Sequence, residues 1–289
     1  MSTTSQLSAG AAGTFTLGAD LTVHRLGYGT MQLPGPGVWG PPADRDEAIA
    51  VLRHTVELGI NLIDTADAYG PFVTDELIRA ALHPYPDELV IATKVGFTRQ
   101  GPDKWAPVGR PEYLRQQTEL NLRNLKVDRL DLLQLHRIDT AVALEDQVGV
   151  LKALQDEGKV RHIGLSEVSV DEMKAARKVA DIVSVQNQFN FSNRSAEPLL
   201  DYCETEGIGF IPWTPLATGD LAASGTPLAA MAQERNHSPS QLVLAWLLKR
   251  SPAMLPIPGT SSIKHLEDNI AAANIQLSAD EFDILNSAA

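Results

Sequence analysis

Four polar residues whose types are used in proton transfer lie at or just after the ends of three short apolar runs: Asp64, Tyr69, Lys94 and His136. The runs cover residues 61–66, 89–94 and 130–136, and each is typical of a buried β-strand. In a parallel sheet the carboxyl ends of the strands meet at one edge, where barrels and open α/β folds place their chemistry. The spacing therefore predicts that the four side chains meet at a reaction site.

A tyrosine beside a lysine and an aspartate suggests proton donation by a phenol. Free tyrosine has a pKa of about 10 and is a poor acid at neutral pH. A positive charge on Lys94 is expected to lower the pKa of Tyr69, while Asp64 holds Lys94 protonated and in place. His136 is expected to hydrogen-bond to a substrate oxygen. This set suits protonation of the oxyanion that forms when a carbonyl group is reduced.

Each of these residues also has a plain structural interpretation. Asp64 and Lys94 could form a rim ion pair, Tyr69 could be a turn aromatic, and His136 could be a core histidine. Their conjunction at successive strand ends favours the functional interpretation. A Schiff-base lyase with Lys94 as its nucleophile is a further alternative. Such a lysine must lose its charge, whereas a neighbouring Asp64 favours the charged form.

Short apolar runs alternate with helical patterns along the chain. The strand candidates are residues 26–31, 61–65, 89–94, 130–136, 162–166, 182–186, 209–213 and 254–257. Capping residues or first-turn prolines at Asp44, Pro111, Ser169 and Ser238 mark helix starts. Eight strand–helix repeats without a long linker favour a closed (β/α)8 TIM barrel, an α/β fold. A β-hairpin over residues 14–24 is expected before the barrel, and a C-terminal helix after it.

We expect residues 14–289 to form a single barrel domain and residues 1–13 to be a flexible N-terminus. The rival fold is a doubly wound sheet, which normally carries a Gly-x-Gly-x-x-Gly turn after its first strand. Here the first strand is followed by residues 33–42, Leu-Pro-Gly-Pro-Gly-Val-Trp-Gly-Pro-Pro. Prolines at those positions would interrupt the helix N-terminus of a phosphate-binding turn. We therefore interpret this segment as a rigid loop at the barrel rim.

The overall composition argues against several classes of protein. A hydrophobic fraction of 44% and a charged fraction of 21% are those of a soluble globular protein. The formal net charge of −12 argues against broad nucleic-acid binding, which requires a basic face. The single cysteine, Cys203, permits no intrachain disulfide, and neither a secretory signal nor a membrane-length apolar run is recognisable. We expect a cytoplasmic protein without membrane contact or metal site; the sequence leaves its oligomeric state open.

Reduction needs a hydride donor, and the later strand ends offer a place for one. Ser166 and Gln186 could hold a carboxamide, and Trp213 could stack on a flat heteroaromatic ring. The run Gly259-Thr-Ser-Ser262 opens a helix, where free backbone N–H groups suit a phosphate. Phosphate sites after the seventh and eighth strands recur in barrels.

With these residues in view, the chain resembles the aldo-keto reductase superfamily from about Phe15 to its C-terminus. The matching motifs are Leu26-Gly-Tyr-Gly-Thr-Met31, Ile63-Asp-Thr-Ala-Asp-Ala-Tyr-Gly70, Ala92-Thr-Lys-Val-Gly96, Asp131-Leu-Leu-Gln-Leu-His136, Ile163-Gly-Leu-Ser166, Val185-Gln186, Trp213-Thr-Pro-Leu216 and Ile257-Pro-Gly-Thr260. The catalytic residues of that family fall on Asp64, Tyr69, Lys94 and His136. The resemblance implies an NADPH-dependent oxidoreductase, in which hydride passes from nicotinamide C4 to an aldehyde or ketone and Tyr69 protonates the oxygen.

The resemblance also implies the cofactor contacts. Ser166 and Gln186 would hold the carboxamide, and Trp213 would stack on the nicotinamide. The positions along the pyrophosphate and the adenosine would be Thr214, Pro215, Leu216, Gly219, Leu221, Gly259, Thr260, Ser261, Ser262, His265 and Asn269. Many relatives have Lys and Arg around the 2′-phosphate where this chain has Gly259 and His265, which weakens the preference for NADPH. NADH is therefore an alternative cofactor.

A third departure lies beside the carboxamide, where Glu167 stands in place of a common asparagine and, when ionised, can accept hydrogen bonds but not donate them. A nucleotide-sensing regulatory subunit is the alternative function that this resemblance allows, although the complete set of four catalytic residues argues against it.

Within the superfamily, the N-terminal half is most similar to a bacterial pyridoxal reductase subgroup. The shared stretches are Arg25-Leu-Gly-Tyr-Gly, Met31-Gln-Leu, Gly35-Pro-Gly-Val, Gly40-Pro-Pro and Tyr69-Gly-Pro. A pyridoxal-like aldehyde is thus a candidate for the small carbonyl substrate. The rim loops, residues 35–42, 97–110 and 217–227, would shape its pocket. Aromatic side chains expected in the pocket wall are Trp39, Phe72, Phe97 and Trp105.

Overall fold

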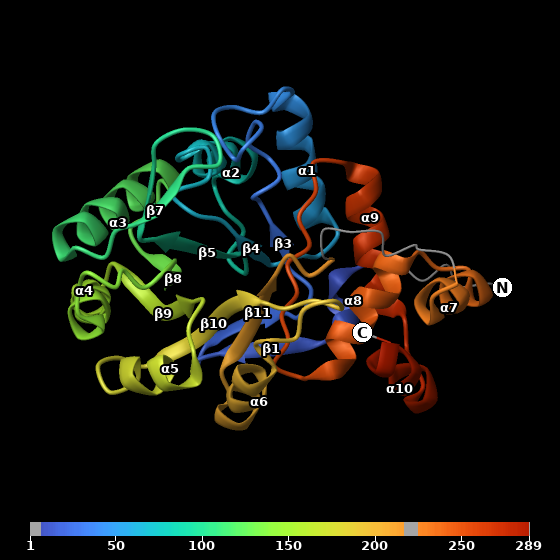
Figure 1. The fold of residues 1–289 in the computed structure, drawn as a ribbon. Helices are drawn as coiled ribbons and strands as arrows, with labels where there is room; N and C mark the ends of the chain where they lie inside the picture. Colours follow the sequence, from blue (N-terminus) through green and yellow to red (C-terminus); the bar gives the residue numbers. More distant parts are fainter. Residues whose placement is uncertain (1–6, 217–224, 289) are drawn as a thin grey trace.

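A parallel sheet curled into a barrel forms the centre of the protein, with helices around its outside (Figure 1). The computed structural model describes residues 7–216 and 225–288. Within these residues the sheet has seven strands, in the order β3 (Tyr28–Gly29), β4 (Leu62–Asp64), β5 (Val90–Val95), β8 (Leu130–Leu135), β9 (Val160–Ser166), β10 (Ile182–Gln188) and β11 (Gly209–Trp213). The expected (β/α)8 fold is confirmed by this sheet and its surrounding helices.

The eighth segment of the barrel is irregular. A strand is predicted over residues 254–257, but this part of the described chain makes only isolated parallel bridges with its neighbours. The backbone nitrogen of Leu255 donates to the oxygen of Phe210 in β11 at 2.8 Å. Pro256 and Pro258 have no N–H to offer, so a regular ladder cannot form on both sides. The barrel is therefore completed by single backbone contacts at this position.

Side-chain alternation along the strands brings the polar residues to the inside of the barrel. Successive side chains of a strand point to opposite faces of the sheet. On β4, β5 and β8 one face contributes Leu62, Val90 and Leu132 to an apolar cluster, and the alternate residues pack in the larger core beneath the helices. Continuing the inward face toward the strand ends leads to the polar residues Asp64, Lys94, Gln134 and His136. The period of two thus predicts their shared location.

An N-terminal hairpin contributes to the same inner cluster. It consists of β1 (Thr14–Leu17) and β2 (Leu21–His24), paired antiparallel as predicted. Leu17, Leu21 and Val23 are buried against the apolar side chains of the barrel interior. The hairpin therefore covers the end of the barrel that lies opposite the polar residues.

The helices begin where the sequence predicts. Asp44 caps α1, Pro111 is the first residue of α3, and Ser169 and Ser238 form capping boxes at α5 and α8. The helices of the described chain are α1 (Arg45–Glu57), α2 (Val73–Leu82), α3 (Pro111–Leu125), α4 (Leu144–Asp156), α5 (Val170–Ala176), α6 (Glu197–Glu206), α7 (Pro227–Arg235), α8 (Pro239–Arg250), α9 (Ile263–Ala271) and α10 (Ala279–Ala288), with a short 3-10 turn, η2 (Ala272–Asn274), after α9. None of these helices is long and apolar enough to cross a membrane.

Two segments differ from the sequence expectation. The rim loop after β5 contains an antiparallel hairpin, β6 (Phe97–Arg99) with β7 (Trp105–Pro107). Part of the N-terminal segment 1–13, expected to be flexible, forms the 3-10 helix η1 (Ala9–Ala12). Ala9 is fully buried, and its N–H donates to the oxygen of Leu58 at 2.9 Å. Small side chains allow this turn to pack closely against the end of α1.

Candidate active site

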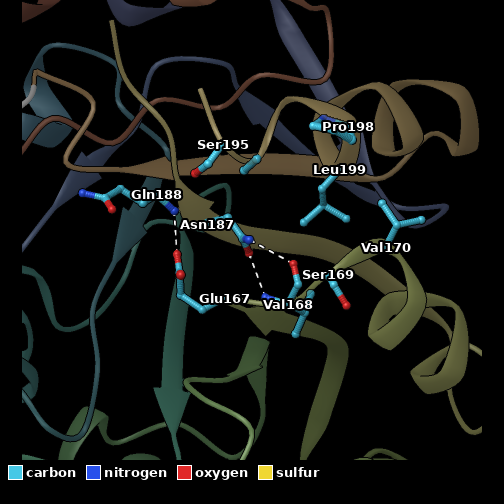
Figure 2. A pocket seen from close by; sticks show the side chains of 10 residues that line it. Glu167, Val168, Ser169, Val170, Asn187, Gln188, Ser195, Pro198 and Leu199 are labelled. Carbon is cyan, nitrogen blue, oxygen red and sulfur yellow. Dashed lines mark hydrogen bonds between the residues drawn. The ribbon is translucent and has the colours of Figure 1, made fainter. Parts of the chain in front are cut away.

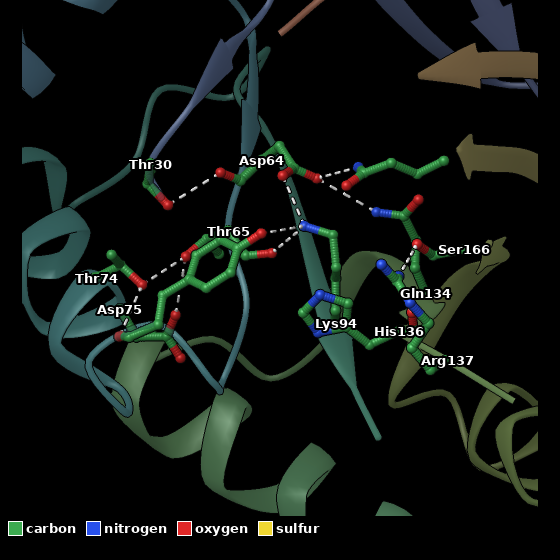
Figure 3. Close-up of polar contacts among 12 residues, drawn as sticks. Thr30, Asp64, Thr65, Thr74, Asp75, Lys94, Gln134, His136, Arg137 and Ser166 are labelled. Carbon is green, nitrogen blue, oxygen red and sulfur yellow. Dashed lines mark hydrogen bonds and ion pairs between the residues drawn. The ribbon is translucent and has the colours of Figure 1, made fainter. Parts of the chain in front are cut away.

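Lys94 is the centre of a buried polar cluster at the strand ends (Figure 3). Its Nζ donates to Asp64 Oδ2 at 2.6 Å, to Thr65 O at 2.9 Å and to the Tyr69 hydroxyl at 3.3 Å. The Lys94 side chain is 0% exposed and that of Asp64 is 3% exposed. Burial by itself lowers the pKa of Lys94, but the charge of Asp64 and the contact with Tyr69 outweigh it and raise that pKa. Lys94 is therefore a fixed cation with three acceptors.

Asp64 is held from its other side by two amides. Gln186 Nε2 donates to Asp64 Oδ1 at 2.8 Å, and Gln134 Nε2 approaches the same oxygen at 3.4 Å. A buried carboxylate is tolerated when it is both ion-paired and hydrogen-bonded. The predicted pairing of Asp64 with Lys94 is thus present, and it belongs to a network that spans β4, β5, β8 and β10.

The phenol of Tyr69 is buried at the opening of this network. Burial raises the pKa of Tyr69, and the nearby charge of Lys94 opposes that effect without cancelling it. The expected net lowering of this pKa is therefore wrong, because the sequence does not reveal how completely the ring is buried. The consequence favours the predicted chemistry, since a protonated phenol at 3.3 Å from a lysine cation can donate its proton.

His136 lies against the same phenol as a neutral imidazole. Its ring centroid is 6.0 Å from that of Tyr69 and 4.6 Å from that of Phe97, both in edge-on geometry. Burial, followed by the charges of Lys94 and Arg137, lowers the pKa of His136 well below its usual value. A neutral ring can donate one hydrogen bond to a substrate oxygen without itself carrying charge.

A cavity of about 180 Å³ opens directly above Asp64 and Tyr69. The lining includes the predicted residues Asp64, Tyr69, Gln186, Trp213, Thr214, Pro215, Leu216 and Gly259. The structure therefore brings part of the predicted catalytic set and part of the predicted cofactor set to one cavity. Met31 and Gln32, which follow β3, also line it and were not predicted from the sequence.

Two further polar residues of the site were missed by sequence reasoning. Gln134 is the next-to-last residue of β8, a mainly apolar strand, and only its inward position on the period-two pattern could have identified it. Arg137 follows His136, and its Nη1 donates to Ser166 Oγ at 3.0 Å and to His136 O at 2.7 Å. Its guanidinium carbon lies 6.0 Å from the centroid of the Trp213 ring. Arg137 therefore connects the strand ends that carry the predicted catalytic residues with those of the predicted cofactor side.

The residues predicted for the adenosine end gather around the start of α9. Ser262 is its N-cap residue and makes no side-chain cap hydrogen bond. The backbone N–H groups of the first turn are therefore not capped by this side chain and can donate to a ligand. Ser262 N donates to Thr260 Oγ1 at 3.1 Å. Ser261 and His265 are exposed, whereas Asn269 is buried. The predicted contacts Gly219 and Leu221 lie outside the described residues.

Two of the four predicted wall aromatics, Phe97 and Trp105, lie against Tyr69 and His136, and a third, Trp39, is connected to them through Arg99. Trp105 lies 6.4 Å from Tyr69 and 5.5 Å from Phe97, measured between ring centroids. The Arg99 guanidinium stacks 3.5 Å above Trp105 and lies 5.7 Å from Trp39. The fourth aromatic, Phe72, precedes α2 with a left-handed backbone, and the described residues show no ring contact between it and the other three.

Arg99 also ties the rim loops together. Its Nη1 donates to Val38 O at 2.8 Å and to Ala68 O at 2.7 Å, and its Nη2 donates to Gly37 O at 2.8 Å. These carbonyls belong to the loop after β3 and to the loop after β4. One guanidinium thus fixes two loops beside the aromatic wall, which sequence spacing alone does not predict.

Comparison with known proteins identifies the family. Residues 25–289 match the Aldo/keto reductase family. The chain belongs to this family. It is 51% identical over 278 residues to an uncharacterised oxidoreductase of Schizosaccharomyces pombe, covering 96% of this chain and 90% of that protein. It is 44% identical over 282 residues to the pyridoxine 4-dehydrogenase of Escherichia coli, covering 96% and 98% of the two chains. The resemblance to the bacterial pyridoxal reductase subgroup is thereby confirmed.

Solved structures agree with this family assignment. An aldo/keto reductase from Klebsiella pneumoniae, crystallised with NADP and acetate, is similar with a TM-score of 0.80 and 28% identity. The similarity covers 95% of this chain and 94% of that chain. The aldo/keto reductase family is one of oxidoreductases, so this membership gives the general class of the protein.

Proposed function

We propose that this protein reduces an aldehyde or ketone to an alcohol with NADPH, and that Tyr69 is the general acid. The observation that carries the proposal is the buried chain from Asp64 through Lys94 to the Tyr69 hydroxyl, which ends in a cavity shared with Trp213. NADPH, when bound, would supply a hydride from nicotinamide C4 to the carbonyl carbon. The residues around the cavity must therefore supply a proton and stabilise the oxygen.

The proton path follows from the hydrogen bonds of the cluster. Tyr69 is protonated because burial raises its pKa, so its hydroxyl can donate to the carbonyl oxygen as negative charge develops there. The phenolate that remains lies 3.3 Å from the Lys94 ammonium, whose charge stabilises it. Asp64 keeps that ammonium protonated and oriented. The neutral imidazole of His136 contributes a second hydrogen bond to the same substrate oxygen.

The hydrogen bonds of Ser166 and Gln186 fit a primary carboxamide. The amide nitrogen of Gln186 is committed to Asp64, so its amide oxygen is the atom that can accept from a carboxamide NH2. Ser166 Oγ accepts an N–H of Arg137, which directs the serine O–H outward as a donor for the carboxamide oxygen. One donor and one acceptor, on neighbouring strands β9 and β10, complement the two polar atoms of a nicotinamide carboxamide.

The start of α9 provides some of the hydrogen-bond donors and positive charge that the 2′-phosphate of NADPH requires. The first turn of α9, with Ser262 as its N-cap residue, presents backbone donors, and Lys264 is exposed in that turn. A helix N-terminus favours an anion through its dipole and its unpaired N–H groups. We propose NADPH as the preferred cofactor because these donors and Lys264 can meet its 2′-phosphate. NADH is a weaker alternative, since Gly259 and His265 provide no fixed positive charge that would make the preference strict.

A small aromatic aldehyde of the pyridoxal type is the proposed substrate. Phe97 and Trp105 form an aromatic wall beside Tyr69 and His136, which suits a flat ring. A relative that is 44% identical is a pyridoxine 4-dehydrogenase. The alternative of a Schiff-base lyase is disfavoured because Lys94 is held as a cation by three acceptors and its pKa is raised.

The test is oxidation of NADPH, and separately of NADH, against a panel of aldehydes and ketones that includes pyridoxal. Tyr69→Phe is expected to lower kcat by about 10²–10⁴-fold, a typical contribution of a general acid, with little change in NADPH affinity. Retained turnover in this variant would remove Tyr69 as the acid. Tight NADPH binding without turnover of any carbonyl would instead favour a nucleotide-sensing subunit, and borohydride trapping of substrate on Lys94 would favour the lyase.

A further inference from the structure

Glu167 connects the ends of three adjacent strands. It follows Ser166 directly after β9, and its Oε1 accepts from the backbone N–H of Gln188 in β10 at 2.6 Å. The same oxygen accepts from the indole Nε1–H of Trp213 at the end of β11, also at 2.6 Å. Figure 2 shows Glu167 and the first of these bonds at the edge of a cavity of about 260 Å³. Glu167 therefore meets both donors with one oxygen.

The backbone around Glu167 directs its side chain to these partners. Its φ of 55° lies in the left-handed region, which is uncommon for a residue other than glycine, asparagine or aspartate. The conformation is held by a hydrogen bond from Glu167 N to Gln186 O at 3.0 Å. The Gln188 N–H is fixed by its strand, so the carboxylate has a rigid anchor before it reaches the indole. The carboxylate is thereby engaged with Trp213 rather than with the donors of a carboxamide.

We propose that Glu167 is a positioning residue that fixes the orientation of the Trp213 indole. A tryptophan at a half-buried strand end has two side-chain torsions, and its Nε1–H lies at one edge of the ring. A charge-assisted hydrogen bond at that edge selects one ring orientation. The ring is also approached by the Arg137 guanidinium, at 6.0 Å. This step rests on the proposed function, in which the nicotinamide stacks on the Trp213 indole. Glu167 would then support the cofactor through Trp213 without touching it.

The hydrogen bond between Glu167 and Trp213 also accounts for the departure from asparagine at position 167. An indole needs an acceptor for its N–H when it is buried, and the longer glutamate side chain reaches both the indole and β10. Gln188 and Trp213 both act as donors, so what the site requires of residue 167 is an acceptor oxygen. Glutamine provides such an oxygen, whereas alanine does not. The two substitutions therefore separate the hydrogen bonds from the charge.

The first measurement needs no cofactor. The near-ultraviolet circular dichroism band that belongs to Trp213 is obtained as the difference between the wild type and Trp213→Phe. We expect Glu167→Ala to lose this band and Glu167→Gln to retain it. The matched control is Glu172→Ala, because the Glu172 carboxylate also accepts two hydrogen bonds, from Ser169 N at 2.7 Å and Ser169 Oγ at 2.8 Å, and lies in the same region. The control should leave the band unchanged.

The second measurement is the dissociation constant of NADPH and the values of kcat and KM in a double-mutant cycle. We expect Glu167→Ala to weaken NADPH binding by about 10-fold, the scale of one hydrogen bond to a charged group. In the Trp213→Phe background, which has no indole N–H, the same change should cost less than about 2-fold. Equal losses in both backgrounds, or a Trp213 band that survives in Glu167→Ala, would overturn the proposal. The dichroism result stands even if the protein turns out not to be a reductase.

Discussion

Two groups of buried carboxyls lie within twelve residues of one another, and their surroundings differ. Asp64 is paired with Lys94 and receives two side-chain amides. Asp67 and Asp75 are equally buried, at 1% and 0% exposure, but no cation pairs with either among the described residues. Both oxygens of Asp67 and one oxygen of Asp75 make no hydrogen bond there. The same side chain is therefore paired with a cation in one region and buried without a cationic partner in the other.

The difference shows that burial alone favours the neutral form of a carboxyl, whereas a cationic partner favours the charged form. Burial, reinforced by Asp75, raises the pKa of Asp67 well above its usual value. Burial also raises the pKa of Asp75, to about 8. Asp75 is thus mainly a neutral acid near pH 7, and burial favours the neutral form of Asp67 as well, beside the charged cluster of Asp64 and Lys94. A neutral carboxyl does not compete with Asp64 and Tyr69 for the positive charge of Lys94.

Removing the Lys94 cation is expected to have the largest effect, because it leaves Asp64 without a cationic partner, as Asp67 and Asp75 are. Lys94→Met keeps the length of the side chain but leaves the Asp64 carboxylate buried without its partner. We expect the free energy of unfolding to fall by about 3–5 kcal/mol, because an unpaired buried charge is costly. We also expect kcat to fall by about 10²–10⁴-fold, because the Tyr69 phenolate loses its stabilising charge. Denaturant unfolding and steady-state kinetics measure the two effects.

The matched control for this variant is Lys152→Met. Lys152 pairs with Asp156 one helical turn away on the exposed face of α4, where 37% of the lysine side chain is accessible. An exposed pair of this kind contributes only about 0–1 kcal/mol. If both lysine variants lose the same stability, the buried pair has no special energetic role.

A weaker perturbation acts on the uncharged region. Asp75→Asn preserves the shape of the side chain and its acceptor for Thr65 but cannot ionise. The folded protein holds the Asp75 proton more tightly than the unfolded chain. Its contribution to stability is therefore complete at low pH and is lost as the pH rises from 3.8 through about 8. We expect Asp75→Asn to be more stable than the wild type at pH 8, by on the order of 1–3 kcal/mol, and to gain much less at pH 5.

Chemical unfolding at the two pH values provides this comparison. Asp128→Asn is the control, since Asp128 is an exposed loop carboxyl and its loss should change stability little at either pH. A stabilisation by Asp75→Asn that is equal at pH 5 and pH 8 would contradict the assignment of Asp75 as a buried neutral acid.

The charged region could be predicted from the sequence, and the uncharged one could not. Strand periodicity and the position of each strand end are local signals, and they sufficed to bring Asp64, Lys94 and His136 together. The direction of the Tyr69 pKa shift was missed because it depends on how the loops cover the ring. Asp67 and Asp75 resemble ordinary loop and first-turn acids in the sequence.

Long-range partners explain the other differences between the prediction and the structure. Glu167 and Trp213 are 46 positions apart and meet only because β9, β10 and β11 are neighbours in the barrel. The eighth strand was predicted from its apolar residues, although the alternate prolines 256 and 258 prevent a regular ladder. Arg99 joins two rim loops through three carbonyl oxygens, a role that depends on the folded loops alone.

Thr65 lies where the two regions meet, and it separates them in the finest test. Its backbone oxygen accepts from Lys94 Nζ at 2.9 Å, while its hydroxyl donates to Thr74 Oγ1 at 2.8 Å and approaches Asp75 Oδ1 at 3.5 Å. Thr65→Val removes only the hydroxyl, so we expect a stability loss of about 0.5–1.5 kcal/mol with kcat nearly unchanged. The hydroxyl also lowers the pKa of Asp75, so the loss of stability should grow between pH 5 and pH 8.

The control is Thr55→Val, which removes a buried hydroxyl that donates to Val51 O at 2.8 Å in α1 and should cost a similar amount of stability at both pH values. A fall in kcat comparable to that of Lys94→Met would mean that the Thr65 side chain serves the charged cluster, and the two regions would then be one.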